Sequence, residues 1–400
     1  MRYLILILIC FWGCRETGLP KLTLTDTEIV DGFNEFGFNL FKEINKIEGD
    51  TNIVISPLSA SMALGMLLNG ARDSTEKAMK NVLGFDGLTD DEINHTYRKI
   101  KDLLPQLDNS VKLNIANSIW YREDLKVRDK FKSTCEKYFD AKITALNFSD
   151  PNAKDVINNW IETETNGKIE DVVDYIDPED VMVLVNALYY KGIWTFRFPE
   201  ESTFIDTFYS PTGKIPCYMM RQKIYCKYLD EDKFDAIILP YGNGNFNMMV
   251  ILPESNIDTV INNMNSENWE KWLNDFTECT VHIYFPKFKI KCKYDNTMKE
   301  ALTSLGMGIA FTPGKANFKD IFEDVLCDSP WIRKAIHATF IQVDEEGTEA
   351  AAATVIILYE GYLQPLYFYV KRPFIFVIFD NYTGTILFIG KVMYPVWKED

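Results

Sequence analysis

Residues 345–354, with the sequence EEGTEAAAAT, combine glutamates with a run of small side chains. Alanine and glutamate alone favour a helix, but Gly347 is a flexible joint and the β-branched residues 355–357 favour an extended chain. In an extended chain, alternate side chains share a face. One face would hold only small uncharged side chains, those of Thr348, Ala350, Ala352 and Thr354. The opposite face would hold Glu349, Ala351 and Ala353. Because the first face could slide between two existing strands, this pattern predicts the addition of a strand to a sheet.

Residues that could act as nucleophiles, bases or metal ligands do not form a catalytic pattern. The three histidines, His95, His282 and His337, stand beside no nucleophile or metal motif. GxSxG, P-loop and HExxH sequences are absent. The eight cysteines include no CxxC pair and no Cys/His spacing typical of zinc. We therefore expect a protein that is not an enzyme and that has no metal or cofactor.

Cysteine pairing is left open by the sequence. Cys10 and Cys14 lie in the N-terminal segment, and the remaining six are Cys135, Cys217, Cys226, Cys279, Cys292 and Cys327. Buried free thiols are the simplest expectation. Cys217 and Cys226 could also form a disulfide, which spacing alone does not decide.

Composition is typical of a soluble globular protein with a large core. The chain has 400 residues, of which 47% are hydrophobic and 25% charged. A net charge of -16 argues against nucleic acid or an anionic membrane as a partner.

The N-terminus carries an export signal. Met1 and Arg2 precede an apolar run of about ten residues, which fits a signal peptide over 1–14 and is too short to span a bilayer. Cys14 follows Gly13 at the end of this run, which is also typical of the lipid-attachment site of bacterial lipoproteins. We expect a secreted protein with a flexible leader over 15–25, the alternative being a lipoprotein anchored through Cys14.

Helical and strand patterns alternate through the rest of the chain, without a repeat or linker that would divide it. We expect one domain over 26–400. Helices are predicted over 26–46, over 60–68 with Ser56 or Ser59 as the cap, and over 157–166 up to Gly167. A short buried strand, a turn and the start of a helix are predicted within 52–59. Strands are predicted over 112–120, 183–194 and 334–343, with two buried strands between 371 and 392.

Several sequence blocks resemble the serpin family of serine protease inhibitors, in the order that the family has them. They are Asn52, Ser56-Pro57, Ser59, Gly70-Ala71 and Thr75; Ile157-Asn158, Trp160 and Thr165-x-Gly167-Lys168-Ile169; Asn186-Ala187 to Trp194; Leu239-Pro240-Tyr241; Phe285-Pro286-Lys287-Phe288; and the hinge-like stretch 345–354. The resemblance implies an α+β fold with three β-sheets, about eight or nine helices and an exposed reactive loop at about 345–366.

The resemblance also implies a site where the central sheet opens to admit the loop. Ser56 and Ser59 would lie beneath the sheet, and Asn186 and Trp194 where its strands part. His337 would sit at the top of the central sheet, and Lys287 would pair with Glu345. The hinge would comprise Glu345, Gly347, Thr348, Glu349, Ala350, Ala351, Ala352, Ala353 and Thr354.

The implied function is suicide inhibition of a serine protease. In this family the protease cuts the loop and forms an acyl-enzyme, and the cut loop then enters the sheet and distorts the protease. The small hinge residues of this chain suit such insertion. The alternatives are a non-inhibitory carrier or chaperone serpin and an inhibitor of a cysteine protease.

Counting by the family's loop length lands on Gly361 from the hinge and on Tyr362 from Pro373. We expect cleavage at Tyr362-Leu363, because Gly361 offers no side chain to a specificity pocket, with Leu363, Tyr359 and Gly361 as alternatives for the recognised residue. An aromatic residue at that place fits the apolar pocket of a chymotrypsin-like protease. We expect a chymotrypsin- or elastase-like target. Glu360 would instead suit a protease that cuts after glutamate.

Two further expectations concern partners. The acidic residues 90–92 occupy the region where some serpins bind heparin, so heparin is disfavoured. We also expect a monomer with a tendency to form loop-sheet polymers, because residues 355–359 are prone to form exposed strands.

Overall fold

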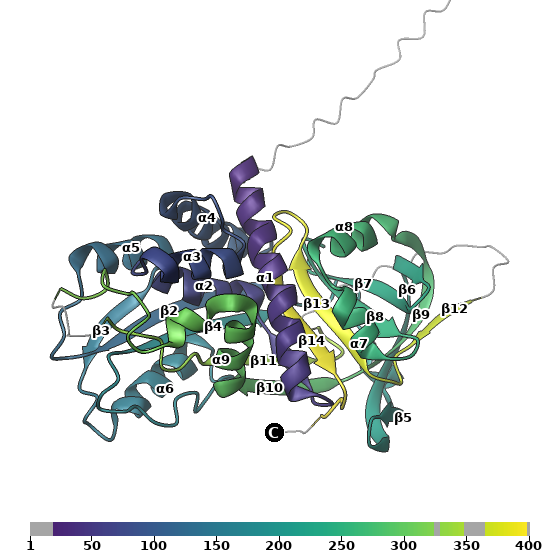
Figure 1. Cartoon of the computed structure of the whole chain (residues 1–400). Coiled ribbons are helices and arrows are strands. Elements are labelled where there is room, and N and C mark those ends of the chain that lie inside the picture. The colour runs from purple at the N-terminus through teal and green to yellow at the C-terminus, as the bar shows by residue number, and fades with distance from the viewer. Residues whose placement is uncertain (1–18, 324–328, 348–364, 398–400) are drawn as a thin grey trace, which may run out of the picture.

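A computed structural model describes residues 19–323, 329–347 and 365–397 (Figure 1). Within these ranges there are nine α-helices and three β-sheets, as expected for the mixed α+β fold. The helices are α1 Leu24–Glu48, α2 Pro57–Leu68, α3 Asp73–Leu83, α4 Asp90–Leu103, α5 Asp129–Phe139, α6 Ala153–Glu164, α7 Ile257–Asn263, α8 Ser266–Asp275 and α9 Asn296–Leu302.

The strands follow the same chain order. They are β1 Ile53–Ile55, β2 Lys112–Arg122, β3 Lys142–Leu146, β4 Met182–Lys191, β5 Phe204–Ser210, β6 Gly213–Glu231, β7 Phe234–Tyr241, β8 Phe246–Pro253, β9 Thr277–Pro286, β10 Phe288–Tyr294, β11 His337–Val343, β12 Leu366–Tyr369, β13 Phe374–Asp380 and β14 Ile386–Val392.

One large sheet and two small ones divide the strands. The large sheet has the order β1-β14-β13-β8-β7-β6-β9-β12, with β5 paired to β6. The second sheet is β3-β2-β4, and the third is the pair β10-β11. In Figure 1 the second and third sheets lie on the side of α1 opposite to β6, β9 and β12.

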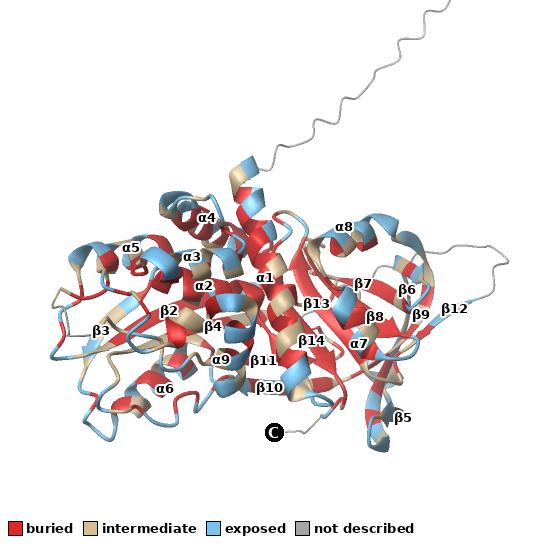
Figure 2. Ribbon diagram, viewed as in Figure 1, coloured by how far each residue is buried: buried red, intermediate tan, exposed pale blue. Residues whose placement is uncertain are grey.

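The core is centred on α1, β8, β13 and β14. Every residue of β8, β13 and β14 is buried, and Figure 2 shows these strands as a continuous red region behind α1. The apolar stripe of α1, which includes Phe33, Leu40 and Ile44, is fully buried. Helix α1 begins at Leu24, within the segment that we expected to form a leader, because Thr23 and Asp26 form a capping box there.

Two predicted strands have different limits in the structure. The predicted strand 183–194 ends at Lys191, so that Trp194 lies beyond it. The strand expected to start at Lys334 starts at His337.

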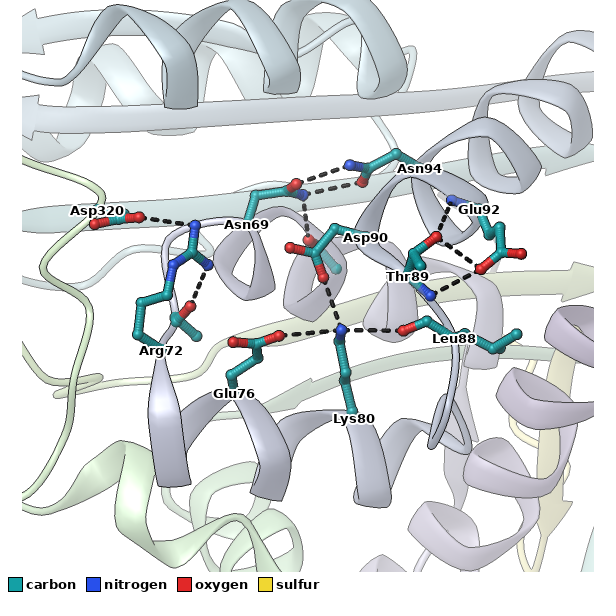
Figure 3. A network of polar contacts seen from close by, with 12 residues as sticks. Asn69, Arg72, Glu76, Lys80, Leu88, Thr89, Asp90, Glu92, Asn94 and Asp320 are labelled. Carbon is teal, nitrogen blue, oxygen red and sulfur yellow. Dashed lines mark hydrogen bonds and ion pairs between the residues drawn. The ribbon is translucent and has the colours of Figure 1, made fainter.

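A polar network ties α3 to the start of α4 (Figure 3). Lys80 Nζ pairs with Glu76 at 3.1 Å and with Asp90 at 2.9 Å, and it donates to the carbonyl of Leu88 at 3.1 Å. Thr89 and Glu92 form the capping box of α4. Lys80 thus has three partners in this network. The first turn of α4 carries three acidic residues.

Candidate functional site

Strands β4 and β11 face each other without a hydrogen-bonded ladder between them in the described part of the chain. β4 is bonded through its other edge to β2, and β11 is bonded through its other edge to β10. Three cavities lie along the line between β4 and β11, and each has walls from both sides. We call this line the gap.

The residues that line these cavities show the relative direction of β4 and β11. Residues 184–187 of β4 share a cavity with 336 and 338, whereas residues 188–191 share one with 340 and 342. Residue numbers therefore rise together on the two sides, and β4 and β11 run parallel. A strand placed between them would be antiparallel to both if it came directly from the end of β11.

The largest of the three cavities, of about 90 Å³, lies at the start of β11. Its walls include Leu64 of α2, Met182 of β4 and Trp331. Since a water molecule needs about 10–15 Å³ of such volume, this cavity has room for several waters.

A cluster of polar contacts lies at this end of the gap, beneath the strands. Ser56 caps α2, and its backbone N–H donates to His337 Nε2 at 3.0 Å. Ser59 Oγ donates to the side-chain oxygen of Asn186 on β4, and the amide nitrogen of Asn186 donates to Asn117 on β2. Asn117 in turn donates to the carbonyl of Phe139 at 2.8 Å. The cluster thus connects α2 with both edges of the gap.

His337 acts in this cluster as a hydrogen-bond acceptor. Its side chain is buried, and burial lowers its pKa from 6.5 to about 4. The imidazole is therefore neutral near pH 7, with the proton on Nδ1 and the lone pair of Nε2 directed at the Ser56 amide.

The opposite end of the gap holds the turn that follows β11. Asp344 and Gly347 bond to each other across this turn, and Gly347 bridges to Ile193. Trp194 makes two hydrogen bonds to this turn. Its backbone N–H donates to Glu346 O at 3.0 Å, and its indole Nε1 donates to Asp344 O at 3.0 Å. The Trp194 ring is stacked on Tyr241, with 4.3 Å between centroids.

Glu345 is the anchor of this turn. Its carboxylate pairs with Lys287 Nζ at 2.7 Å and accepts from Thr203 Oγ1 at 2.7 Å. Burial would raise the pKa of Glu345, but the bonds from Lys287 and Thr203 outweigh burial and lower it. The ion pair that the sequence predicted between Lys287 and Glu345 is present.

An aromatic side chain covers this ion pair. The ring centroid of Trp397 lies 4.2 Å from Lys287 Nζ and 5.3 Å from Lys289 Nζ, which is within the range of a cation–π interaction. The segment is held in place by a bond from Lys289 N to Val396 O at 2.8 Å. Trp397, Thr203 and Asn117 were not predicted as site residues, because their partners are distant in the chain.

Gly347 requires the absence of a side chain. Its φ is +124°, and a Cβ at this position would lie 2.5 Å from the carbonyl oxygen of Gly192 and from the amide nitrogen of Trp194. The turn therefore depends on glycine for both conformation and space.

The predicted opening residues fall into two groups rather than one. Ser56, Ser59, Asn186 and His337 lie at the start of β11, whereas Trp194, Lys287 and Glu345 lie beyond its end. His337 was expected at the top of the central sheet, but it is the first residue of β11, about 20 Å along the strand from Val343. That position follows from its bond to Ser56, which caps a helix beneath the sheet.

The remaining predicted sites lie outside the described residues. These are the hinge positions Thr348, Glu349, Ala350, Ala351, Ala352, Ala353 and Thr354, the bond Tyr362-Leu363 with its alternatives Gly361 and Tyr359, and the lipid-attachment candidate Cys14.

The suggested pairing of Cys217 with Cys226 is wrong. Both residues lie on β6 nine positions apart, which separates them by about 30 Å along the strand. Both are buried free thiols.

Comparison with known proteins places this geometry in a family. Residues 31–395 match the family described as Serpin (serine protease inhibitor). An uncharacterized serpin-like protein of Methanosarcina acetivorans is 34% identical, over 96% of this chain and 92% of its own length. The corticosteroid-binding globulin of Oryctolagus cuniculus is 32% identical, over 90% of this chain and 94% of its own length.

A solved structure agrees with these matches. The crystal structure of a thermophilic serpin, tengpin, in the native state superposes with a TM-score of 0.85 and 31% identity, over 94% of this chain and 96% of that one. The family match over residues 31–395 includes β4, β11, the turn after β11 and the polar cluster beneath the gap. The chain therefore belongs to the serpin family.

Proposed function

We propose that this serpin is a suicide inhibitor of serine proteases, with the gap between β4 and β11 as the acceptor of its cut loop. The observation that carries the proposal is the pair of parallel edges that no ladder joins within the described residues, with a tight turn directly after β11. A chain that continues from Gly347 back along β11 would enter the gap antiparallel to both edges.

Insertion is favoured because it pairs two strand edges at once. Each added backbone hydrogen bond contributes about 1 kcal/mol, and β4 and β11 together present edges of ten and seven residues. The small uncharged face at Thr348, Ala350, Ala352 and Thr354 allows entry without burying charge or bulk.

The chemical step belongs to the protease. Its serine attacks the loop carbonyl and expels the amine of the following residue, which leaves the N-terminal part of the loop esterified to the protease. Insertion of this part then carries the protease with it and disturbs the oxyanion hole on which deacylation depends. Inhibition requires that insertion outrun hydrolysis of the ester.

A chymotrypsin-like protease is the proposed target, with cleavage between Tyr362 and Leu363. No Lys or Arg lies between Gly347 and Val370, which disfavours a trypsin-like target, and Tyr362 would fill an apolar specificity pocket. Gly361, Leu363 and Tyr359 are the alternatives for the recognised residue.

The test is incubation with chymotrypsin, followed by a denaturing gel and by mass spectrometry of the released C-terminal peptide. We expect a complex that survives SDS and a peptide that begins at Leu363. Clean cleavage without a complex, by chymotrypsin and by elastase, would overturn inhibition of this protease class. The matched control is Thr348→Ser, which keeps the inward face small and is expected to retain the complex.

A carrier function is the second candidate, since corticosteroid-binding globulin is among the relatives. The cavity at the start of the gap, about 90 Å³, is smaller than the roughly 300–1,000 Å³ of usual ligand sites. Equilibrium dialysis with a labelled corticosteroid distinguishes the two functions. Saturable binding without a protease complex would favour the carrier.

Export is proposed from the segment 1–14, with lipid attachment at Cys14 as the alternative. Among the described helices, none has the length and apolar character needed to cross a membrane.

We also propose that heparin is not an activator, because α4 begins with Asp90, Asp91 and Glu92. The protein is expected to be a monomer that forms loop-sheet polymers on mild heating, and only monomer on a native gel after heating would contradict this.

A further inference from the structure

Strands β6 and β9 place two cysteines directly opposite each other. In the antiparallel register Cys226 faces Cys279, between the pairs Tyr225–Thr280 and Lys227–Glu278. Side chains at directly opposed positions lie on one face of the sheet, with Cβ atoms about 4.5–5.5 Å apart. A disulfide needs Cα atoms about 4.4–6.8 Å apart and Cβ atoms about 3.5–4.5 Å apart. A small adjustment of the two strands therefore suffices for a bond.

The surroundings keep the two thiols together and away from other partners. Cys226 is 7% exposed and Cys279 is partly exposed. The next inward-facing pair along the strands, Ile224 and Val281, is buried and apolar. Burial raises the pKa of both thiols, that of Cys226 to about 12. The thiolate is the reactive form of cysteine, and an oxidant must be able to reach it. Cys279 is the more exposed of the two and therefore reacts first.

We propose that Cys226 and Cys279 form a redox site that closes as a cross-strand disulfide in an oxidising compartment. The oxidant is a small-molecule disulfide, such as oxidised glutathione. The thiolate of Cys279 attacks one sulfur of the oxidant and releases one small thiol, which leaves a mixed disulfide on Cys279. The thiolate of Cys226 then attacks the Cys279 sulfur and releases the second small thiol. The two cysteines lose two protons and two electrons, and the oxidant gains both.

The bond strengthens the edge that carries β12. β12 pairs in parallel with β9 and begins at Leu366 opposite Val281, two residues beyond Cys279. It is the edge strand of the large sheet and the first strand after residues 348–364. A disulfide between β9 and β6 links the strand that pairs with β12 to the next strand toward the interior of the sheet. The thermal unfolding midpoint of the oxidised protein therefore rises.

The experiment compares the full chain before and after incubation with oxidised glutathione. We expect a mass lower by about 2 Da, which is the loss of two hydrogens. Proteolytic peptides that contain Cys226 and Cys279 should be joined until a reductant is added. Closing a loop of this length should raise the unfolding midpoint by about 2–5 °C.

Serine variants identify the bond. The mass loss should vanish in Cys226→Ser and in Cys279→Ser and should persist in Cys217→Ser, a buried cysteine on the same strand. Circular dichroism confirms that each variant is folded. Alkylation of both thiols after oxidation, a stable adduct of glutathione alone, a bond to another cysteine, or an unaltered midpoint of the bonded protein would overturn the proposal. None of these results depends on whether the chain inhibits a protease.

Discussion

Acid should weaken the native state through His337. The folded pKa of His337 is about 4 and its ordinary value is 6.5, so protons bind the unfolded chain more tightly. The contribution of the neutral imidazole is fully present above pH 6.5 and is lost as the pH falls toward 4. A difference of about 2.5 pKa units corresponds to about 3 kcal/mol of unfolding free energy.

The matched variant is His337→Gln, whose side-chain oxygen can still accept from the Ser56 amide but does not titrate. Urea unfolding, followed by tryptophan fluorescence, should be measured for both proteins from pH 7.5 to 4. Between these values the wild type should lose about 3 kcal/mol relative to the variant. Other acidic groups such as Glu345 titrate equally in both and cancel. Parallel stability curves would refute the assignment of a buried neutral His337.

Three further substitutions test the two ends of the gap and its proposed occupant. Lys287→Met should cost about 2 kcal/mol because it leaves the Glu345 carboxylate buried and unpaired, and Lys287→Met/Glu345→Gln should recover most of this loss in urea unfolding; an additive double variant would contradict the pairing. Gly347→Ala should destabilise the turn by about 1–3 kcal/mol through its positive φ and its contact with Gly192, and an unchanged unfolding midpoint would contradict it. Thr348→Arg should abolish the SDS-stable protease complex while leaving cleavage intact, because a charge on the inward face slows insertion, and retained stoichiometric inhibition on a titration would contradict that reasoning.

The sequence was sufficient where function depends on a local pattern or a family motif. The block around Lys287 led to its partner Glu345, an ion pair that the structure contains. The hinge predicted from the alternation of small residues lies outside the described residues and stays a prediction. Ser56 or Ser59 was predicted to cap the helix that follows, and Ser56 is the residue that caps α2.

Features that depend on distant segments were not predictable. The opposition of Cys226 and Cys279 requires the register of β6 and β9, which no local pattern sets. Trp397 covers Lys287 only because the end of the chain runs beside β10.

The most direct test of loop insertion is amide hydrogen exchange of β4 and β11 before and after the loop is cut. If the cut loop enters the gap, amides of residues 184–190 and 338–342 should exchange more slowly in the cleaved protein, while β13 and β14 stay unchanged. Cleavage that leaves exchange in β4 and β11 unaltered would contradict the account, because no strand would then have been added between them.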